Sequence, residues 1–315
     1  MIDTFQIYAR PNYSEKQDIK KHFQPNRIKD AFVWTLTATK GISMKYLMSQ
    51  EKRISLLQMV VNPALVLEKR QIVNDDYASI VTAIDRILAL YCGRMRVADF
   101  NLSRIDYKLD IVTPYKDIYV GILKQLQFSY RRKHQQEWMT SVYYNGKSYT
   151  INLYDKEAKE GASFKDVLRL ELQLKSRWIR RQFNEYGMVA SLRNYFNDSV
   201  RRNTFEDLLT PLIYRGDHYT IRKSRYVLAE YGYSEKTVTK LLDFQRLVLQ
   251  HGMSASTRLS GKSANTVRGY IVKLQNAGVN PVPLPHDCRV NHLPGLLTYL
   301  GDVNHKNSSS VNEAS

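Results

Sequence analysis

Two short segments in which polar and apolar side chains alternate constrain the fold of this chain more than any other feature. In each segment, residues of one parity are apolar and residues of the other parity are charged or polar. Successive side chains of a β-strand point to opposite faces, so each segment predicts a strand with one buried face and one polar face. The polar sets are Arg104, Asp106, Lys108 and Asp110 in residues 103–111, and Arg169, Glu171, Gln173 and Lys175 in residues 168–175.

Two further segments extend this pattern. Residues 150–156 (TINLYDK) alternate in the same way and place Tyr154 and Lys156 on one face, whereas the more apolar segment 55–62 places Gln58 on its polar face. A solvated face of an antiparallel sheet explains such alternation without any function. If instead the strands adjoin with their polar faces together, four side chains surround one point on the uncovered side of the sheet: Asp106, Glu171, Gln58 and Tyr154.

Helical periodicity accompanies the strands and then replaces them. Residues 76–91 and 116–133 carry apolar side chains at spacings of three and four, as helices packed on one side of a sheet do. From about residue 176 the pattern is helical and basic, and no internal repeat is evident. The sequence therefore predicts an α+β fold, an antiparallel sheet with helices on one face followed by a helical C-terminal domain. The expected boundaries are 1–200 for the sheet domain, 201–300 for the helical domain and 301–315 for a disordered tail.

The charge of the chain indicates its partner. Lys and Arg number 47 against 30 Asp and Glu, a net charge of +17 in 315 residues. Such an excess favours nucleic acid, with an anionic membrane surface as the competing partner. No apolar run approaches the roughly 18–20 residues that span a bilayer, and we expect a cytoplasmic protein without a membrane partner. The two cysteines, Cys92 and Cys288, indicate neither a disulfide framework nor a zinc site.

The residue types on the polar faces suit a particular chemistry. Two carboxylates on separate strands, Asp106 and Glu171, can hold a hard divalent cation through oxygen ligands and leave positions open for a phosphate. A nearby tyrosine can then attack phosphorus, provided that its phenol, with an ordinary pKa near 10, is helped to lose its proton. By strand parity, Lys156 is placed to supply positive charge beside Tyr154.

Four blocks of sequence, in order, resemble a known group of proteins. The chain is similar to the initiators of filamentous phages of the gene II type and to the replication initiation factor family of small rolling-circle plasmids. The first block has an N-P-x-x-x-L turn after a strand, the second a S-R-I-D strand, the third a tryptophan, a hairpin and a Y-x-K ending, and the fourth an R-x-E strand before a basic helix. These blocks are residues 56–68, 102–110, 136–156 and 168–179.

The resemblance assigns roles to individual residues. It implies that Tyr154 is the nucleophile and Lys156 its companion, and that Asp106 and Glu171 bind Mg²⁺ or Mn²⁺. Gln58 lies where family members often have a polar or acidic residue. Many members carry a glutamate five residues after the tyrosine, where this chain has Lys159, and the seven histidines include no His-x-His pair. The resemblance therefore implies ligation rich in carboxylates.

The activity implied by the resemblance is that of a rolling-circle replication initiator. Such an enzyme is a site-specific nickase that cuts one strand at the origin, forms a 5′-phosphotyrosine and a free 3′ hydroxyl, and rejoins the displaced strand. Expected partners are origin DNA, single- and double-stranded, and the host helicase and polymerase. Two alternatives remain: a non-catalytic, sequence-specific DNA-binding regulator, and a related relaxase or transposase.

The C-terminal region offers a candidate DNA-binding motif. Residues 234–251 and a second helix with its N-cap at Ser263 are joined by a short turn that contains glycine, as in a helix-turn-helix, although an ordinary helical hairpin has the same pattern. Basic side chains elsewhere are expected to contact phosphates. The candidate DNA contacts are Arg104, Arg169, Lys175, Arg177, Arg180, Arg181, Arg268 and Lys273, with Arg131, Arg132 and Lys133 as a further basic run.

Overall fold

The structure, a computed structural model, describes residues 2–28, 31–49, 54–126, 135–138 and 140–301. The chain divides into two compact units, each built from several segments. The first comprises residues 1–109, 146–151 and 171–201, and the second comprises residues 110–145, 152–170 and 202–315. The expected tail and the basic run at 131–133 lie outside the described residues.

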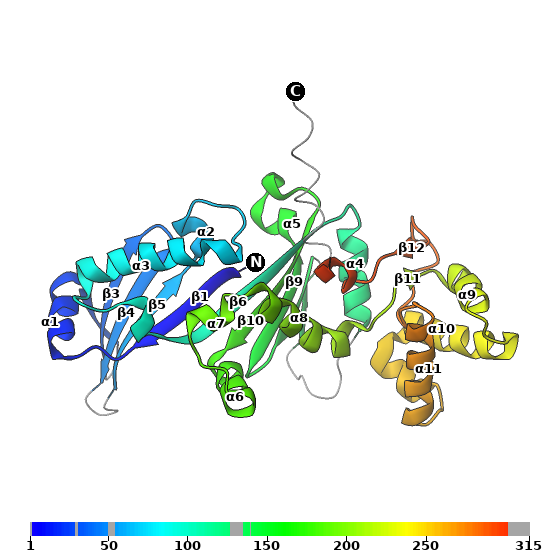
Figure 1. The fold of residues 1–315 in the computed structure, drawn as a ribbon. Coiled ribbons are helices and arrows are strands. Elements are labelled where there is room, and N and C mark those ends of the chain that lie inside the picture. Colours follow the sequence, from blue (N-terminus) through cyan, green and yellow to red (C-terminus); the bar gives the residue numbers. More distant parts are fainter. Residues whose placement is uncertain (1, 29–30, 50–53, 127–134, 139, 302–315) are drawn as a thin grey trace. The chain divides into compact units, whose positions relative to one another are not determined.

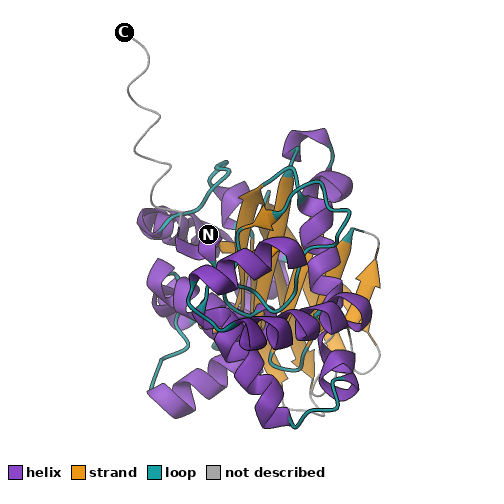
Figure 2. Ribbon diagram, turned by 90° about the vertical axis from the view of Figure 1, so that its right-hand side faces the viewer, coloured by secondary structure: helices purple, strands orange, loops and turns teal. Residues whose placement is uncertain are grey.

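The predicted antiparallel sheet is present. Its ten strands follow the order β2-β3-β4-β5-β1-β6-β10-β9-β8-β7, and helices pack against it (Figure 1; Figure 2). The strands are β1 (Ile2–Ala9), β2 (Gln24–Ile28), β3 (Ala31–Thr39), β4 (Ile42–Ser49), β5 (Ile54–Val61), β6 (Asn101–Val112), β7 (Gln135–Trp138), β8 (Ser141–Asn145), β9 (Tyr149–Asp155) and β10 (Val167–Lys175).

The first unit carries the helices α1 (Tyr13–His22), α2 (Pro63–Val66) and α3 (Tyr77–Tyr91), and later α6 (Ser176–Tyr186) and α7 (Leu192–Tyr195). The helix expected at 76–91 is confirmed as α3, which buries Ile80, Ile84 and Leu88 at a spacing of four. Phe5 and Ile7 of β1 are fully buried, because alternate residues of this central strand point into the core. The α+β prediction is confirmed.

The second unit carries the C-terminal helices. The helix expected at 116–133 is present as α4 (Lys116–Gln125), and its remaining residues lie outside the described part from 127 onward. Helix α4 packs against β8 and α10. The remaining elements are α5 (Lys156–Glu160), α8 (Asp198–Ile213), β11 (His218–Tyr219), α9 (Ile221–Glu230), α10 (Glu235–Leu259), α11 (Ala264–Asn276), β12 (His292–Leu293) and α12 (Thr298–Gly301).

The boundary expected near residue 200 falls inside a helix. The first unit ends at Arg201, whereas α8 runs from Asp198 to Ile213. The second unit also takes in residues 110–145 and 152–170, so the units do not follow each other along the chain. The separation into a domain at 1–200 and a domain at 201–300 stays a prediction. Among the described residues, no helix has the length and apolar character needed to cross a membrane.

The polar faces of these strands are partly enclosed. Three of their side chains, Asp106, Lys108 and Arg169, are buried, which a purely solvated face does not explain. Each of the three forms an ion pair with a neighbouring side chain. Ion pairing reduces the cost of removing a charge from water, and this allows polar strand positions to be enclosed.

Candidate active site

Tyr154 lies at the end of β9, where the strand gives way to α5. Its side chain is buried, with 3% of the residue exposed. The next residue, Asp155, is the N-cap of α5, and its carboxylate accepts a hydrogen bond from the Ala158 N–H at 3.2 Å. The strand period therefore stops at Asp155. Lys156 is the first residue of the helix, so strand parity does not decide on which side of Tyr154 it lies, and its role as companion of the tyrosine stays a prediction.

Lys159 places a cation against the ring of the tyrosine. Its Nζ lies 4.2 Å from the centre of the Tyr154 ring. A cation over an aromatic face is attracted to the ring, and a positive charge beside a phenol favours the phenolate. Sequence reasoning noted Lys159 only as a departure from the family pattern. The turn from strand to helix at Asp155 brings the lysine back over the ring, and the Asp cap at 155 was the signal available in the sequence.

Lys156 is buried within the second unit. Its Nζ lies 3.4 Å from Oε2 of Glu160 and 3.4 Å from the centre of the Phe164 ring. Burial lowers the pKa of Lys156 below its ordinary value, and the nearby charge of Arg169 lowers it further. A lysine in this state gives up or accepts a proton closer to neutral pH than an exposed lysine does.

A bridge from α4 holds the start of α5. The Lys116 Nζ donates to Oδ1 of Asp155 at 3.0 Å and to Oε2 of Glu157 at 2.6 Å. Burial opposes the charge of Lys116, but the hydrogen bonds to these two carboxylates raise its pKa overall. Lys116 thereby fixes the residues that follow Tyr154.

Arg169 and Asp110 form a bidentate pair in the same unit. Nε and Nη2 of Arg169 donate to the two carboxylate oxygens of Asp110 at 2.5 and 2.6 Å. Arg169 is buried, with 5% of the residue exposed. The sequence suggested Arg169 as a DNA contact, and the structure turns this guanidinium toward Asp110.

The first unit holds a separate cluster around Asp106 and Arg104. Nε of Arg104 donates to the two carboxylate oxygens of Asp106 at 2.9 and 3.1 Å, and Nη2 also contacts the carboxylate. With its amide oxygen toward Arg104, Gln173 accepts from Nε at 3.0 Å and from Nη2 at 2.8 Å. Burial raises the pKa of Asp106, Arg104 opposes this rise, and the charge of Asp3 adds to it. Asp3 also accepts from the Lys108 Nζ at 2.8 Å.

Glu171 belongs to this cluster. The hydrogen bond to Asp106 raises the pKa of the Arg104 guanidinium against the effect of burial, and the charges of Asp106, Asp3 and Glu171 add to this rise. The donor set consists of carboxylate and amide oxygens, which suits a hard divalent cation. The Arg104 guanidinium lies against these oxygens, and no group of three or more His, Cys, Asp or Glu within the described ranges is arranged to hold a metal. A metal at Asp106 and Glu171 would therefore displace the guanidinium.

Gln58 is not brought to these carboxylates. In the register of the sheet, Gln58 of β5 lies opposite Tyr8 of β1, and Tyr8 lies opposite Asn101 of β6. Asp106 is five residues farther along β6 (106 − 101), or about 16 Å at the rise of a strand. The suggested role of Gln58 as a ligand has no support in the register.

Helix α6 presents basic and aromatic side chains to solvent. Arg177, Arg180 and Arg181 are exposed, and Arg181 pairs with Glu185 at 2.9 Å. Phe183 and Tyr186 of the same helix are 54% and 72% exposed. Exposed rings beside basic groups suit the bases and phosphates of single-stranded DNA. Lys175, just before α6, donates instead to the Gly146 carbonyl at 2.8 Å.

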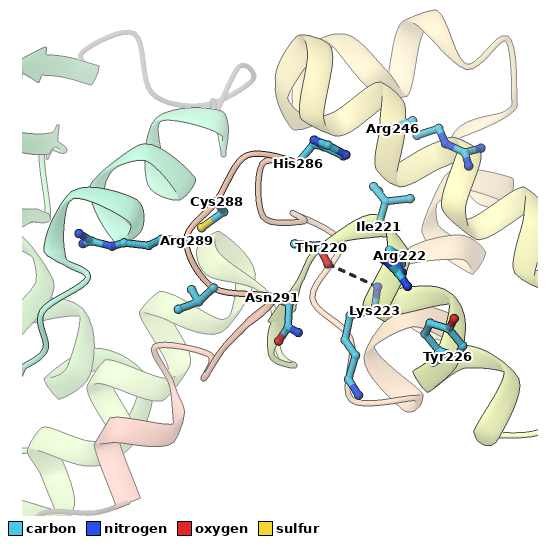
Figure 3. A pocket seen from close by; sticks show the side chains of 11 residues that line it. Thr220, Ile221, Arg222, Lys223, Tyr226, Arg246, His286, Cys288, Arg289 and Asn291 are labelled. Atoms are coloured by element: carbon cyan, nitrogen blue, oxygen red, sulfur yellow. Dashed lines mark hydrogen bonds between the residues drawn. The ribbon is translucent and has the colours of Figure 1, made fainter.

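A basic pocket of about 850 Å³ lies at the start of α9 in the second unit (Figure 3). Thr220, the N-cap of α9, lies at its wall. In the part of the chain that the structure describes, no acidic side chain lines this pocket. Its positively charged lining residues are Arg222, Lys223, Arg246 and Arg289, with His286 beside them.

Comparison with known proteins places the chain in a family. The model of the Phage_CRI family, described as the N-terminal part of a replication-associated protein, matches residues 8–194, which is more than half of the chain. The chain belongs to this family. The matched region contains Tyr154, Asp106 and Glu171.

One solved structure to which the chain is similar is that of a rolling circle replication initiator protein from Geobacillus stearothermophilus. The identity is 14% and the TM-score 0.40, over 66% of this chain and 83% of the other. No curated protein matches the chain.

We predict that Asp110→Ala destabilises the protein strongly, because it leaves Arg169 buried without its bidentate partner. The free energy of unfolding should fall by about 3 kcal/mol. Asp117→Ala is the matched control, since it removes the partner of Arg289 from an exposed pair and should cost less than about 1 kcal/mol. Chemical denaturation of the full chain measures both changes. Equal losses in the two variants would contradict the assignment of a buried pair.

Proposed function

We propose that this chain is a rolling-circle replication initiator, in which Tyr154 nicks one DNA strand at an origin and the enzyme later rejoins it. The family match over residues 8–194 is the observation that carries the proposal. The cation of Lys159 against the Tyr154 ring supports the choice of tyrosine. A phenolate is the nucleophilic form, and a positive charge at the ring stabilises it.

In the proposed reaction, the phenolic oxygen of Tyr154 attacks the scissile phosphorus and displaces the 3′ oxygen of the preceding nucleotide. The P–O bond to the 3′ oxygen breaks, a 5′-phosphotyrosine forms, and the released oxygen takes up a proton as a 3′ hydroxyl. Lys156, whose pKa is lowered by burial, is the proposed acceptor of the phenolic proton. Rejoining is the reverse reaction, in which a 3′ hydroxyl attacks the phosphotyrosine and releases Tyr154.

The proposed partner is origin DNA. Single-stranded DNA at the nick site suits the arginines and exposed rings of α6, and duplex DNA suits the basic side chains of the C-terminal helices. Host polymerase would extend the 3′ hydroxyl, and a host helicase would open the duplex. These steps would occur in the cytoplasm of the host.

Mg²⁺ or Mn²⁺ is the proposed cofactor, held by Asp106 and Glu171. When bound, such an ion neutralises charge on a phosphate oxygen. The support for this site is the oxygen donor set that now surrounds the Arg104 guanidinium. Arg104 donates to Asp106 and interacts with the charge of Glu171, so the guanidinium would have to move aside when the ion binds.

The alternative is a DNA-binding protein without catalysis, and the burial of Tyr154 favours it. A buried phenol has to become accessible before it can attack phosphorus. Covalent attachment to DNA separates the two functions, because a binding protein forms no bond with its DNA.

We predict that Tyr154→Phe abolishes covalent attachment to single-stranded origin DNA, because it removes the attacking oxygen and keeps the ring. Tyr149→Phe at the other end of β9 is the matched control and should form the adduct as the wild type does. Denaturing electrophoresis with labelled oligonucleotide detects the adduct. An adduct formed by the Tyr154→Phe variant would move the nucleophile to another residue. Absence of any adduct from the wild-type protein would favour the non-catalytic alternative.

We predict that Lys159→Met slows nicking at pH 7 by a factor of about two to five, the effect of a cation–π contact of about 0.5–1 kcal/mol. The defect should shrink as the pH rises toward the ordinary phenol pKa near 10, where the phenolate forms without help. Lys165→Met, an exposed lysine after α5, is the control and should follow the wild-type pH profile. A defect of constant size from pH 7 to pH 10 would argue against an electrostatic role for Lys159.

We predict that Glu171→Gln weakens Mn²⁺ binding and abolishes metal-dependent nicking, because one remaining carboxylate rarely holds such an ion alone. Gln58→Ala should bind Mn²⁺ as the wild type does, since the register places Gln58 away from Asp106. Titration of the full chain with Mn²⁺, followed by electron paramagnetic resonance, measures the affinity. Unchanged Mn²⁺ affinity in Glu171→Gln, or full nicking in EDTA, would eliminate the proposed metal site.

A further inference from the structure

The C-terminal helices contain a repeat that sequence analysis missed. Residues 232–238 read GYSEKTV and residues 261–267 read GKSANTV. Glycine, serine, threonine and valine recur at the same four positions, 29 residues apart (261 − 232). The expectation of no internal repeat is therefore wrong. The repeat covers only seven residues, and longer neighbouring helices with different surface side chains obscure it.

The two copies have similar local structures, which differ in that the Ser263 side chain accepts from the Thr266 N–H and the Ser234 side chain makes no such cap hydrogen bond. Each begins with a glycine at positive φ, 96° at Gly232 and 61° at Gly261. Ser234 and Ser263 then occupy the N-cap positions of α10 and α11. In both copies the serine hydroxyl contacts the threonine hydroxyl three residues later, at 3.1 Å and 2.9 Å. The valine after the threonine is buried in both copies. The repeat is therefore one turn-and-cap unit used twice.

Gly252 divides helix α10 into two parts, so that each copy of the repeat has one helix before its turn and one helix after it. Helix α10 is interrupted at Gly252, whose φ of 73° and ψ of 166° are not helical. A Cβ at this position would lie 2.9 Å from the Gln125 carbonyl oxygen, so glycine is required there. The first copy thus joins α9 to residues 235–251, and the second joins residues 253–259 to α11. Both have the order helix, short glycine turn, helix, which is typical of a helix-turn-helix.

The two copies differ in the side chains that their second helices expose. In a helix-turn-helix, side chains near the start of the second helix reach the DNA bases. Helix α11 exposes Asn265 and Arg268 there, residue types that form paired hydrogen bonds with adenine and guanine. Helix α10 exposes Lys236 and Lys240, point charges that suit phosphates. Among described residues, none of these four side chains makes a hydrogen bond or ion pair.

The basic pocket at the start of α9 indicates that the first copy binds the phosphate backbone of DNA. The first helix of a helix-turn-helix lies across the DNA backbone. Arg222 and Lys223, in the first turn of α9, line the pocket together with Arg246 of α10 (Figure 3). The first copy is therefore basic on both of its helices.

We infer that the C-terminal helices form a duplicated helix-turn-helix that binds duplex DNA, in which α11 reads bases and the α9–α10 copy holds the phosphate backbone. This inference rests on the proposed function for its partner, DNA. It differs from an ordinary helical hairpin because it assigns sequence preference and salt dependence to different helices.

The test uses the full-length chain and a library of random 20-base-pair duplexes. Wild-type protein should enrich a defined sequence. The double variant Asn265→Ala/Arg268→Ala should lose at least about tenfold of its preference for that sequence over a scrambled duplex, because each paired base contact contributes about 1–3 kcal/mol. Lys236→Ala/Lys240→Ala should keep the preference but bind both duplexes more weakly. Its salt slope should fall by about 1.8, or about 0.9 for each phosphate contact.

Arg70→Ala, an exposed arginine of the first unit, is the control for loss of charge and should leave the preference unchanged. Adduct formation on single-stranded DNA is measured on the same preparations. The four substitutions in α10 and α11 leave Tyr154 in place, so the adduct should form in both variants, and a failure of this test is distinct from a failure of the proposed nicking. Retained preference in the α11 double variant would overturn the inference. So would an altered preferred sequence in the α10 double variant, or no enrichment by the wild-type protein.

Discussion

Pairing of charges inside the polar strands is the constraint on which the rest of this structure depends. Asp106 of strand β6 is buried and pairs with Arg104, and Arg169 of strand β10 is buried and pairs with Asp110 of β6. An unpaired charge at such a position would cost several kcal/mol. The pairs therefore permit the central strands to carry charged residues, and they also fix where those charges lie.

The same pairing shapes the chemistry available to the second unit. Asp110 holds the Arg169 guanidinium in place, and burial together with the charge of Arg169 lowers the pKa of Lys156. The Lys116 bridge holds Asp155 and Glu157 at the start of α5, and α5 carries Lys159 to the Tyr154 ring. The cation that the structure places at Tyr154 thus comes from helix α5 rather than from the strand that bears the tyrosine.

Much of the fold follows from periodicity in the sequence, because strand and helix periods are local properties. The sequence correctly predicted the strand at residues 103–111 with its apolar face, the helix α3 and the strand that carries Tyr154. The burial of Lys108 and Arg169 on the polar faces of their strands was not predicted. Their ion-pair partners lie 105 and 59 residues away in sequence, beyond the reach of a local pattern. Gln58 was misplaced for a similar reason, since strand β1 lies between β5 and β6. Parity gives the face of a residue but not its position along neighbouring strands.

The central claim is that Tyr154 is the residue that becomes joined to DNA. Full-length protein would be reacted with a single-stranded origin oligonucleotide and a divalent metal, then digested with nuclease and protease for mass spectrometry. The account predicts one modified peptide, with a nucleotide phosphate on Tyr154 and a free 3′ hydroxyl on the released DNA fragment. A phosphate on Tyr149, Tyr143 or Tyr144, or a 5′ hydroxyl on the released fragment, would contradict it.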